Sequence, residues 1–250
     1  MKILLGGALG RMGREVTAAA AEAQVEIVCG VDVAYTGQPS DYPIVTAFDQ
    51  ATQKADVLID FSRPSALPEL LQLVRKEKMP AVLCTTGYNE AELQMIEEAS
   101  REIPVFRSAN MSLGVNVLRH LVQEAARALG EDFDVEIVER HHRMKADSPS
   151  GTALMLYDSV KEATETLRQP VFGRYGRTAQ RQPGEVGIHA VRGGTITGEH
   201  EVCFYGDGEE LILTHRAEKR SLFARGALRA AAFLMDKPAG KYDMQDLIEE

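Results

Sequence analysis

The middle of the sequence holds a dense group of residues that could transfer protons and bind anions. His141 and His142 are followed closely by Arg143 and Lys145. Imidazole and amine groups are common proton donors and acceptors in enzymes, and neighbouring cations lower one another's pKa values toward a useful range. The pattern therefore predicts acid–base chemistry here, with a solvent-exposed surface lysine as the alternative for Lys145.

A turn of small residues follows this group. Ser150, Gly151 and Thr152 stand at the start of a helix expected over 151–167. The free backbone N–H groups and the positive dipole end of a helix N-terminus suit a carboxylate. Ser148 or Ser150 could equally serve only as the helix cap. The spacing fits both an anion site and a plain cap.

The histidine pair and the cysteines do not predict a metal site. Adjacent residues on a strand point to opposite faces, so one metal ion could not easily bind both His141 and His142. Cys29, Cys84 and Cys203 form no C-x-x-C pair, which argues against structural zinc or a disulfide framework. We expect no metal and reduced thiols.

A glycine-rich turn near the N-terminus could hold a dinucleotide. Gly7, Gly10 and Gly13 follow a G-x-x-G-x-x-G spacing between an expected strand at 2–5 and an expected helix over 11–23. Such glycines let backbone N–H groups approach a pyrophosphate at the helix N-terminus. A close-packed turn without a ligand is the alternative for this motif taken alone.

An acid and two loops strengthen the nucleotide interpretation. Asp32 stands ~20 residues beyond the glycines, where a carboxylate accepts hydrogen bonds from an adenosine ribose. The loops at 84–87 and 108–110 follow later strands of the same half. Open α/β sheets bind ligands at the carboxyl ends of their strands. Together these features favour a dinucleotide site over a purely structural turn.

The first half of the chain alternates short apolar runs with amphipathic stretches. Continuous apolar strands between helices imply a parallel sheet that is covered on both faces. This half is therefore predicted to be a Rossmann-like, doubly wound α/β domain. Strands are expected at 2–5, 25–31, 57–61, 81–85 and 105–107, and helices at 11–23, 64–77 and 89–101.

The second half predicts an α+β domain with a mixed, mainly antiparallel sheet. Polar and apolar residues alternate between 188 and 218 around glycine-containing turns, as in antiparallel strands with one wet face. Residues 172–187 are expected to form a long loop, and such loops are often functional. A strand is expected at 135–142, and helices at 115–129, 151–167 and 221–235.

The change of pattern places a domain boundary near residue 110. The first domain, for the dinucleotide, would span 1–110, with the C-terminal helical segment 221–250 packing back onto it. The second, for substrate binding and oligomerisation, would span 111–220.

Composition excludes several classes of partner. The 250 residues include 28 basic and 37 acidic side chains, which give a net charge of −9. An acidic surface repels phosphate backbones and anionic headgroups, so we expect neither nucleic acid nor membrane as a partner. The first apolar run ends too soon for a signal peptide, and none reaches the ~20 residues of a membrane helix. The expected location is the cytoplasm.

The stretch from Glu136 to Ala153, with its His-His-x-x-Lys and Ser-Gly-Thr elements, resembles the signature of 4-hydroxy-tetrahydrodipicolinate (dihydrodipicolinate) reductases. Further motifs similar to this family follow in family order over nearly the whole chain. They are the glycine turn 7–13, Asp60–Pro64, Thr85–Gly87, Ala109–Asn116 and Gly198–His200.

The resemblance implies an NAD(P)H-dependent oxidoreductase of lysine and diaminopimelate biosynthesis. Such enzymes reduce (2S,4S)-4-hydroxy-2,3,4,5-tetrahydrodipicolinate to tetrahydrodipicolinate. Hydride goes to C4 of the dehydrated cyclic imine and a proton to the neighbouring carbon. The expected partner is thus a small dicarboxylate. The family also implies a homotetramer built through the sheet of the second domain, and a hinge that closes on substrate.

The resemblance also assigns roles to residues. His141 would act as acid/base and Lys145 as proton donor. A dianionic substrate needs cationic and backbone-donor groups. The substrate residues would be His142, Ser150, Gly151 and Thr152. The cofactor residues would be Gly7, Ala8, Leu9, Gly10, Arg11, Met12, Asp32, Cys84, Thr85, Thr86, Ser108, Ala109, Asn110 and Met111.

Two positions depart from the family pattern. Many members carry an arginine after the acid of the second strand, where it can pair with a 2′-phosphate, but here Val33 follows Asp32. A lone acid repels a 2′-phosphate, so we predict a preference for NADH. NADPH stays possible if a cation such as Lys2 or Arg11 compensates. Cys84 replaces a common glycine and is expected to change mainly loop packing.

The sequence fits other function classes less well. A different two-domain Rossmann dehydrogenase, for homoserine or a sugar, should lack the His-His-x-x-Lys block. A nucleotide-sensing regulator would need a basic DNA-binding segment, which the sequence does not show. A catalytically silent relative would keep the fold and lose turnover, and the presence of His141 and Lys145 argues against it.

Overall fold

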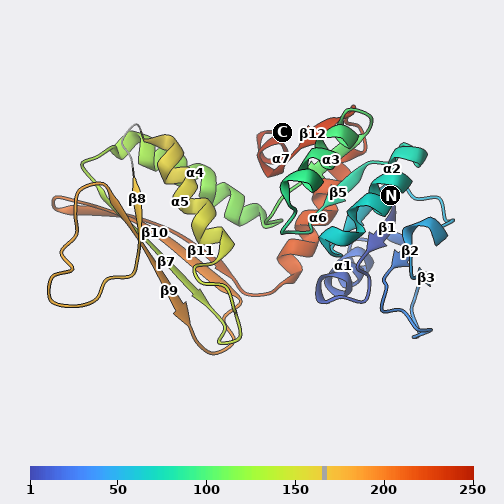
Figure 1. The fold of residues 1–250 in the computed structure, drawn as a ribbon, viewed down its shortest axis with the longest axis horizontal. Helices are drawn as coiled ribbons and strands as arrows, with labels where there is room; N and C mark the ends of the chain where they lie inside the picture. The colour runs from blue at the N-terminus through green and yellow to red at the C-terminus, as the bar shows by residue number, and fades with distance from the viewer. Residues whose placement is uncertain (165–167) are drawn as a thin grey trace. The chain divides into compact units, whose positions relative to one another are not determined.

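The chain folds into two compact units (Figure 1). The computed structural model describes residues 1–164 and 168–250. One unit comprises Met1–Leu113 and Arg220–Glu250, and the other comprises Gly114–Lys219. Each unit has its own sheet and its own hydrophobic core. Within the described residues, no helix is long and apolar enough to cross a membrane.

The first unit is built on a seven-stranded sheet in the order β12-β6-β5-β4-β1-β2-β3. All of its strand pairs are parallel. The run from β3 to β6 has the strand order of a dinucleotide-binding fold, so the predicted Rossmann-like class is confirmed. The strands are β1 (Lys2–Gly6), β2 (Glu26–Val31), β3 (Ile44–Val45), β4 (Val57–Asp60), β5 (Ala81–Leu83), β6 (Pro104–Arg107) and β12 (Gly240–Tyr242).

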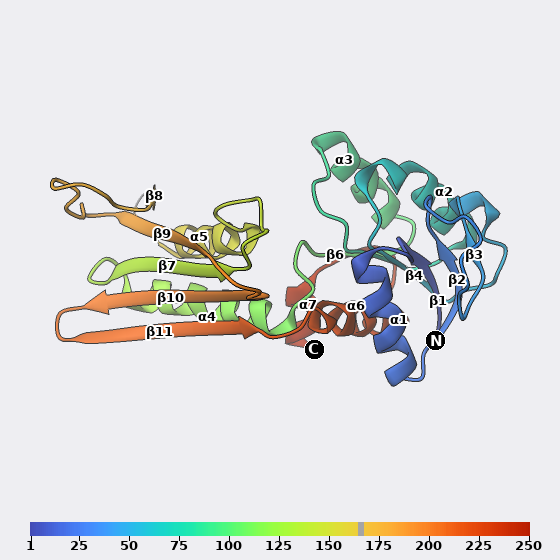
Figure 2. The same ribbon diagram turned by 90° about the horizontal axis from the view of Figure 1, so that it is seen from below.

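Helices cover both faces of this sheet (Figure 2), because alternate residues of each strand point to opposite sides. Leu5 and Ile59 pack in one core with α1 and α6, whereas Leu4 and Leu58 pack in another with α2 and α3. Successive residues of a strand thus pack into different cores, on opposite faces of the sheet. Both cores need apolar side chains, and this explains the continuous apolar runs. The helices are α1 (Arg11–Glu22), α2 (Leu67–Glu77), α3 (Glu90–Ser100), α6 (Ser221–Leu234) and α7 (Met244–Glu249).

The second unit carries a mixed five-stranded sheet in the order β11-β10-β7-β9-β8. Two helices, α4 (Leu113–Leu129) and α5 (Gly151–Ala163), cover one face (Figure 1). Leu118 and Leu156 from these helices pack on Ile137 and Val202 of the sheet. The strands are β7 (Asp134–His141), β8 (Gln169–Phe172), β9 (Glu185–Arg192), β10 (Gly198–Gly206) and β11 (Glu209–Ala217).

The second sheet differs from the expectation in its strand directions. β10 is antiparallel to β7 and β11, but β9 runs parallel to both β7 and β8. The mixed class is confirmed, and the antiparallel part begins only at β10. Alternation of polar and apolar residues reports a half-buried strand and not the direction of its neighbour.

Several helix and strand boundaries also differ from the predicted ones. The predicted loop over 172–187 is shorter, because β8 ends at Phe172 and β9 begins at Glu185. The helix predicted to start at Pro64 begins as a 3-10 turn, Pro64–Ala66, before α2. The helix expected over 151–167 ends at Ala163, and residues 165–167 of that prediction lie outside the described part.

Candidate active site

The glycine turn joins β1 to α1 at the carboxyl edge of the first sheet. Gly7 adopts a left-handed φ of 73°, which suits a residue without a Cβ. A Cβ on Gly13 would collide with the carbonyl oxygen of Gly7. Gly10 is the N-cap residue of α1 and has no side chain to fill the space over the helix N-terminus. The turn is therefore close-packed and also open to a ligand at the helix end.

Asp32 braces this turn from the end of β2. Its carboxylate accepts hydrogen bonds from the backbone N–H groups of Leu9 and Ala34, each at 2.9 Å. A cavity of about 190 Å³ opens beside it, lined by Gly7, Gly10, Val33, Ser62 and Arg63 among others. Backbone donors at a helix N-terminus with an acid on the rim are what a pyrophosphate and a ribose require. These residues fit the adenosine end of a nicotinamide dinucleotide.

The later cofactor loops lie at the same edge. The strand ends are in register, with Gly6 beside Asp60, Asp60 beside Leu83 and Leu83 beside Arg107. The predicted loops at 84–86 and 108–111 follow directly from these ends. The structure thus brings all the predicted cofactor segments to one edge of the first unit.

A buried carboxylate anchors the Cys84–Thr86 segment. Thr85 donates its hydroxyl to Oδ2 of Asp60 at 2.7 Å, and the N–H of Ser62 donates to Oδ1 at 3.2 Å. Burial raises the pKa of Asp60, and these hydrogen bonds oppose the shift. Cys84 is buried next to it, and burial raises the pKa of its thiol well above the usual value. Cys84 therefore packs as an inert side chain.

The 108–112 loop is tied by its own side chains. Ser108 donates its hydroxyl to the carbonyl of Asn110 at 2.9 Å, and the N–H of Asn110 donates back to Ser108 Oγ at 3.2 Å. The N–H of Ser112 donates to Oδ1 of Asn110 at 2.9 Å. These local bonds hold the loop in one conformation beyond β6.

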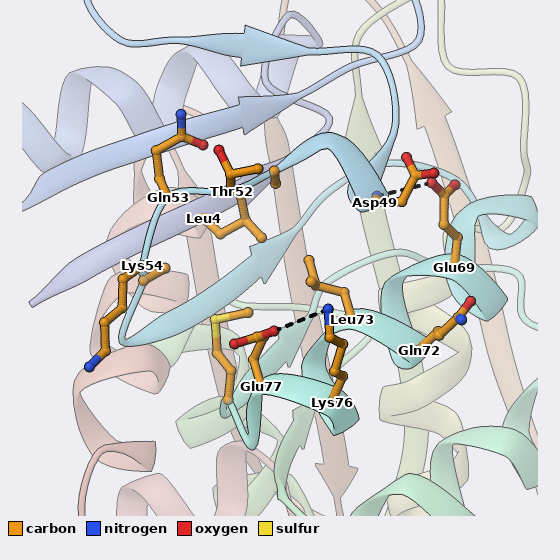
Figure 3. Close-up of a pocket in the computed structure, with 13 residues that line it drawn as sticks. Leu4, Asp49, Thr52, Gln53, Lys54, Glu69, Gln72, Leu73, Lys76 and Glu77 are labelled. Carbon is orange, nitrogen blue, oxygen red and sulfur yellow. Dashed lines mark hydrogen bonds and ion pairs between the residues drawn. The ribbon is translucent and has the colours of Figure 1, made fainter.

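A larger hollow of the same unit lies among other residues (Figure 3). It measures about 740 Å³ and is lined by α2 and the segment before β4, including Asp49, Lys54 and Lys76. Lys76 pairs with Glu77 at 3.7 Å, and both side chains are exposed. None of the predicted site residues lines it, so it is not the candidate site.

In the second unit, the last strand residues of β7 form a carboxylate–imidazole pair. Glu139 and His141 lie on the helix-covered face, because both positions alternate with the partly exposed residues of β7. Nδ1 of His141 lies 2.6 Å from Oε2 of Glu139. Burial lowers the pKa of His141, the bond to Glu139 opposes this, and the charges of Lys145 and Arg192 lower it further. The imidazole is therefore biased toward its neutral form.

Glu139 also binds the start of α5 and a cation from β9. Its Oε1 accepts the backbone N–H of Ser150 at 2.9 Å. The guanidinium of Arg192 donates to both carboxylate oxygens, each at 2.7 Å. Burial would raise the pKa of Glu139, but the bonds from Arg192, His141 and Ser150 outweigh it and lower this pKa. The carboxylate is ionised.

A second buried histidine completes the cluster. Nε2 of His200 lies 3.0 Å from the hydroxyl of Ser150, and its ring packs edge-on against His141 with centroids 5.2 Å apart. Burial, followed by repulsion from His141, lowers the pKa of His200 to about 3. His200 is neutral at physiological pH and acts as a packing and hydrogen-bonding group.

Lys145 lies on the turn that follows β7. Its backbone N–H donates to the carbonyl of His142 at 3.1 Å, and its Nζ pairs with Oδ1 of Asp147 at 2.9 Å. The side chain is four-fifths buried, with 20% of its surface exposed, so it is not a solvated surface lysine. Its charge lowers the pKa of His141, which places the two side chains within electrostatic reach.

Ser150 caps α5, as one of the two alternatives predicted. Its hydroxyl accepts the N–H of Ala153 at 3.2 Å. Gly151 opens the helix and is exposed, and Thr152 is partly exposed. The cap and the anion site are compatible, because capping occupies the Ser150 hydroxyl and leaves the exposed helix end at Gly151.

Three residues of this cluster were not assigned from the sequence. The motifs contain Glu139 and His200 but predict no role for either, and no motif contains Arg192. A Glu-x-His pattern on a strand could have indicated Glu139, since alternate residues share a face. Arg192 has no local signal, because 53 positions separate it from Glu139. Across residues 1–164 and 168–250, no group of three or more His, Cys, Asp or Glu could hold a metal ion.

Comparisons with known proteins cover both units. The family model for the N-terminus of dihydrodipicolinate reductase matches residues 1–111, and the family model for its C-terminus matches residues 114–248. A 4-hydroxy-tetrahydrodipicolinate reductase of Caldanaerobacter subterraneus is 49% identical, over 100% of this chain and 99% of the relative. One of Clostridium tetani is 45% identical, over 99% and 97%.

Solved structures share the fold. A dipicolinate-bound dihydrodipicolinate reductase from Paenisporosarcina superposes with a TM-score of 0.78 at 22% identity, covering 97% of both chains. A myo-inositol dehydrogenase from Corynebacterium glutamicum reaches a TM-score of 0.59 at 16% identity, covering 96% of this chain and 90% of the other. The architecture is thus common to dehydrogenases of different substrates, and the substrate must be argued from the site.

Proposed function

The chain belongs to the dihydrodipicolinate reductase family, and from this we infer that it reduces 4-hydroxy-tetrahydrodipicolinate to tetrahydrodipicolinate. The predicted family, enzyme class and reaction are confirmed by full-length relatives and by both family models. The enzyme is an NAD(P)H-dependent oxidoreductase of the lysine and diaminopimelate route.

The observation that carries this function is the cluster at the end of β7. An imidazole with a lowered pKa, a partly buried lysine and an exposed helix N-terminus lie within one turn and its flanking elements. A small dicarboxylate needs such groups, because its two charges must be neutralised while one carbon accepts a proton. A sugar dehydrogenase would not need a carboxylate site beside its acid–base pair.

We assign His141 and Lys145 to proton transfer. Lys145 would donate the proton to the carbon next to C4, and His141 would act as acid/base beside it. The hydride for C4 comes from the reduced nicotinamide when that cofactor is bound. His142, Ser150 and the Gly151–Thr152 amides would hold the substrate carboxylates at the helix end.

The cofactor is a pyridine nucleotide, and we propose NADH as the preferred one. Asp32 presents its charge at the cavity beside the glycine turn, and Val33 next to it is exposed and uncharged. A 2′-phosphate would meet the carboxylate without a cation at position 33. Arg63 also lines this cavity and is the side chain through which NADPH would be accepted.

The two parts of the chain are assigned to different tasks. Residues 1–110, with 221–250, would bind the dinucleotide, and residues 111–220 would bind substrate and form the assembly. We propose a cytoplasmic homotetramer. The sheet face opposite α4 and α5 supports this, because it leaves Val191 and Ile212 each 45% exposed, and a second copy could cover them.

The deciding experiment supplies substrate in place. Purified protein would be incubated with NADH and, in parallel, with NADPH, while the upstream synthase generates the hydroxylated imine. Oxidation of the cofactor that depends on the synthase is the expected result. If both cofactors bind but neither is oxidised with the synthase present, the reductase function is wrong and a sensor or silent relative replaces it.

A further inference from the structure

We propose that Glu139 is a positioning residue, which fixes the ring of His141 so that Nε2 is its reactive nitrogen and also places the start of α5. This inference rests on the proposed function, because it assigns a task within the same reaction. Glu139 itself is fully buried, so it cannot contact substrate. It acts through His141 and Ser150.

The hydrogen bonds of Glu139 use both carboxylate oxygens twice. Oε2 faces His141 Nδ1 and one Arg192 nitrogen, and Oε1 accepts from Ser150 and the other Arg192 nitrogen. A carboxylate has about four lone-pair sites, so its capacity is filled. The same side chain is therefore a rigid link between β7, β9 and the first turn of α5.

The ionised state of Glu139 dictates the tautomer of His141. An ionised carboxylate can only accept, so Nδ1 must carry the proton of the neutral ring. Arg192 keeps the carboxylate ionised by its two-pronged contact. Nε2 is then left with its lone pair, and this is the nitrogen that can take or return a proton.

The groups around His141 agree with this arrangement. Lys145 on the turn and Arg192 on β9 are cations, and His200 on β10 packs edge-on as a neutral ring. Glu139 is the acidic group among those that act on the ring, and its carboxylate contacts Nδ1. Without Glu139, the positive charge of Arg192 would be left unneutralised beside the imidazole, and the ring of His141 could flip to another orientation.

The link to Ser150 couples proton transfer to substrate binding. The N–H that Glu139 accepts belongs to the cap residue of α5. Any shift of the carboxylate would therefore move the imidazole and the proposed carboxylate-binding helix end together. A purely structural ion pair would be expected to stabilise the unit without affecting the tautomer.

The test is the tautomer of His141, read by long-range ¹H–¹⁵N spectra of ¹⁵N-histidine-labelled full-length protein above neutral pH. Its signals would be assigned by their loss in His141→Asn. In the unsubstituted protein we expect the Nδ1–H form. An Nε2–H form there would overturn the proposal without any variant of Glu139 and whatever the substrate.

The variant Glu139→Gln then separates positioning from structure. Glutamine keeps the size and one acceptor for Ser150, but its amide nitrogen cannot accept from Nδ1–H. We expect the tautomer to change and kcat to fall about 10²-fold, the low end of general acid–base effects, with a much smaller change in KM. If kcat and tautomer stay unchanged, Glu139 is only structural.

A matched control comes from the same strand. Glu136 binds His189 Nε2 at 2.6 Å and Arg174 Nη1 at 2.8 Å, the same carboxylate–imidazole–guanidinium trio on the other face of β7. Glu136→Gln should leave the His141 tautomer and kcat unchanged. An equal loss of kcat in both variants would mean that any broken ion pair disturbs the unit, which would also overturn the proposal. Failure of the unsubstituted protein to reduce its substrate would instead contradict the proposed function, and the tautomer result would stand by itself.

Discussion

Gly198 of β10 provides the space that the ring of His141 occupies. A Cβ built on Gly198 would lie 3.1 Å from Nε2 and 3.5 Å from Cδ2 of that ring. Glycine at a strand position often marks such a close approach. The ring is thus bounded on one side by Glu139, through Nδ1, and on another by the bare backbone of β10. Its position depends on both.

Gly198→Ala should lower kcat about tenfold, because the imidazole must give way by a few tenths of an ångström and misplacement of a reacting group is costly. Cofactor affinity should not change. Steady-state kinetics and NADH titration check this. Gly193→Ala is the control, since a Cβ there meets open space. Turnover equal to that of the unsubstituted protein would show that His141 tolerates displacement.

His200 should make stability fall as the medium is acidified. Its pKa is about 3 in the folded protein and 6.5 when unfolded, so the unfolded chain binds the proton first. Stability from this group is complete above the unfolded pKa and is lost as pH falls through the window between the two values. The slope is about 1.4 kcal/mol per pH unit below the unfolded pKa.

Urea unfolding of the unsubstituted protein and of His200→Asn, at one protein concentration and several pH values below 7, measures this slope. His141 and His215 also have lowered pKa values and contribute in both proteins. The difference between the two curves therefore isolates His200. Curves that run parallel would show that His200 is not held neutral by burial.

Local patterns predicted five of the seven strands of the first unit and missed the two short edge strands, β3 and β12. The glycine turn, Asp32 and the strand ends follow from the period of apolar residues and from chain order, because parallel strands end at one edge. The bond from Leu9 N–H to Asp32 is not visible in such a pattern. It shows that the acid expected at the ribose also supports the turn that is predicted to bind the phosphates.

The second unit was less predictable because its site depends on strand pairing. The match of His141 and Lys145 to a family motif indicated their tasks, but the partners of His141 come from three strands. Arg192 reaches Glu139 only because β9 pairs with β7 in parallel, with Arg192 beside His141. The sequence pattern predicted a mixed, mainly antiparallel sheet with antiparallel strands from residue 188 onward, and an antiparallel β9 would have placed different side chains beside His141.

Val33→Arg should lower the KM for NADPH about tenfold, the effect of about 1.4 kcal/mol, and leave the KM for NADH nearly unchanged. Val33 is 64% exposed and next to Asp32, so an arginine there can reach a 2′-phosphate without repacking the core. Parallel assays with both cofactors check this. Val33→Gln, of similar reach without charge, is the control.

An unsubstituted protein that already prefers NADPH would contradict the NADH proposal. Arg63→Ala then identifies the cause, because Arg63 lines the same cavity. Loss of NADPH use in that variant alone would assign the 2′-phosphate to Arg63. If neither substitution has an effect, the ribose does not bind beside Asp32.

Lys145→Ala should lower kcat by about 10²- to 10⁴-fold, the range for removal of a general acid. The dissociation constant for NADH should stay the same, because Lys145 belongs to the turn after β7 and not to the glycine turn. Stopped-flow turnover and fluorescence titration of NADH measure the two quantities separately. Lys161→Ala, an exposed lysine of α5, should change neither. Loss of NADH binding with Lys145→Ala would move this lysine from proton transfer to the cofactor site, and His141 would then be the proton donor.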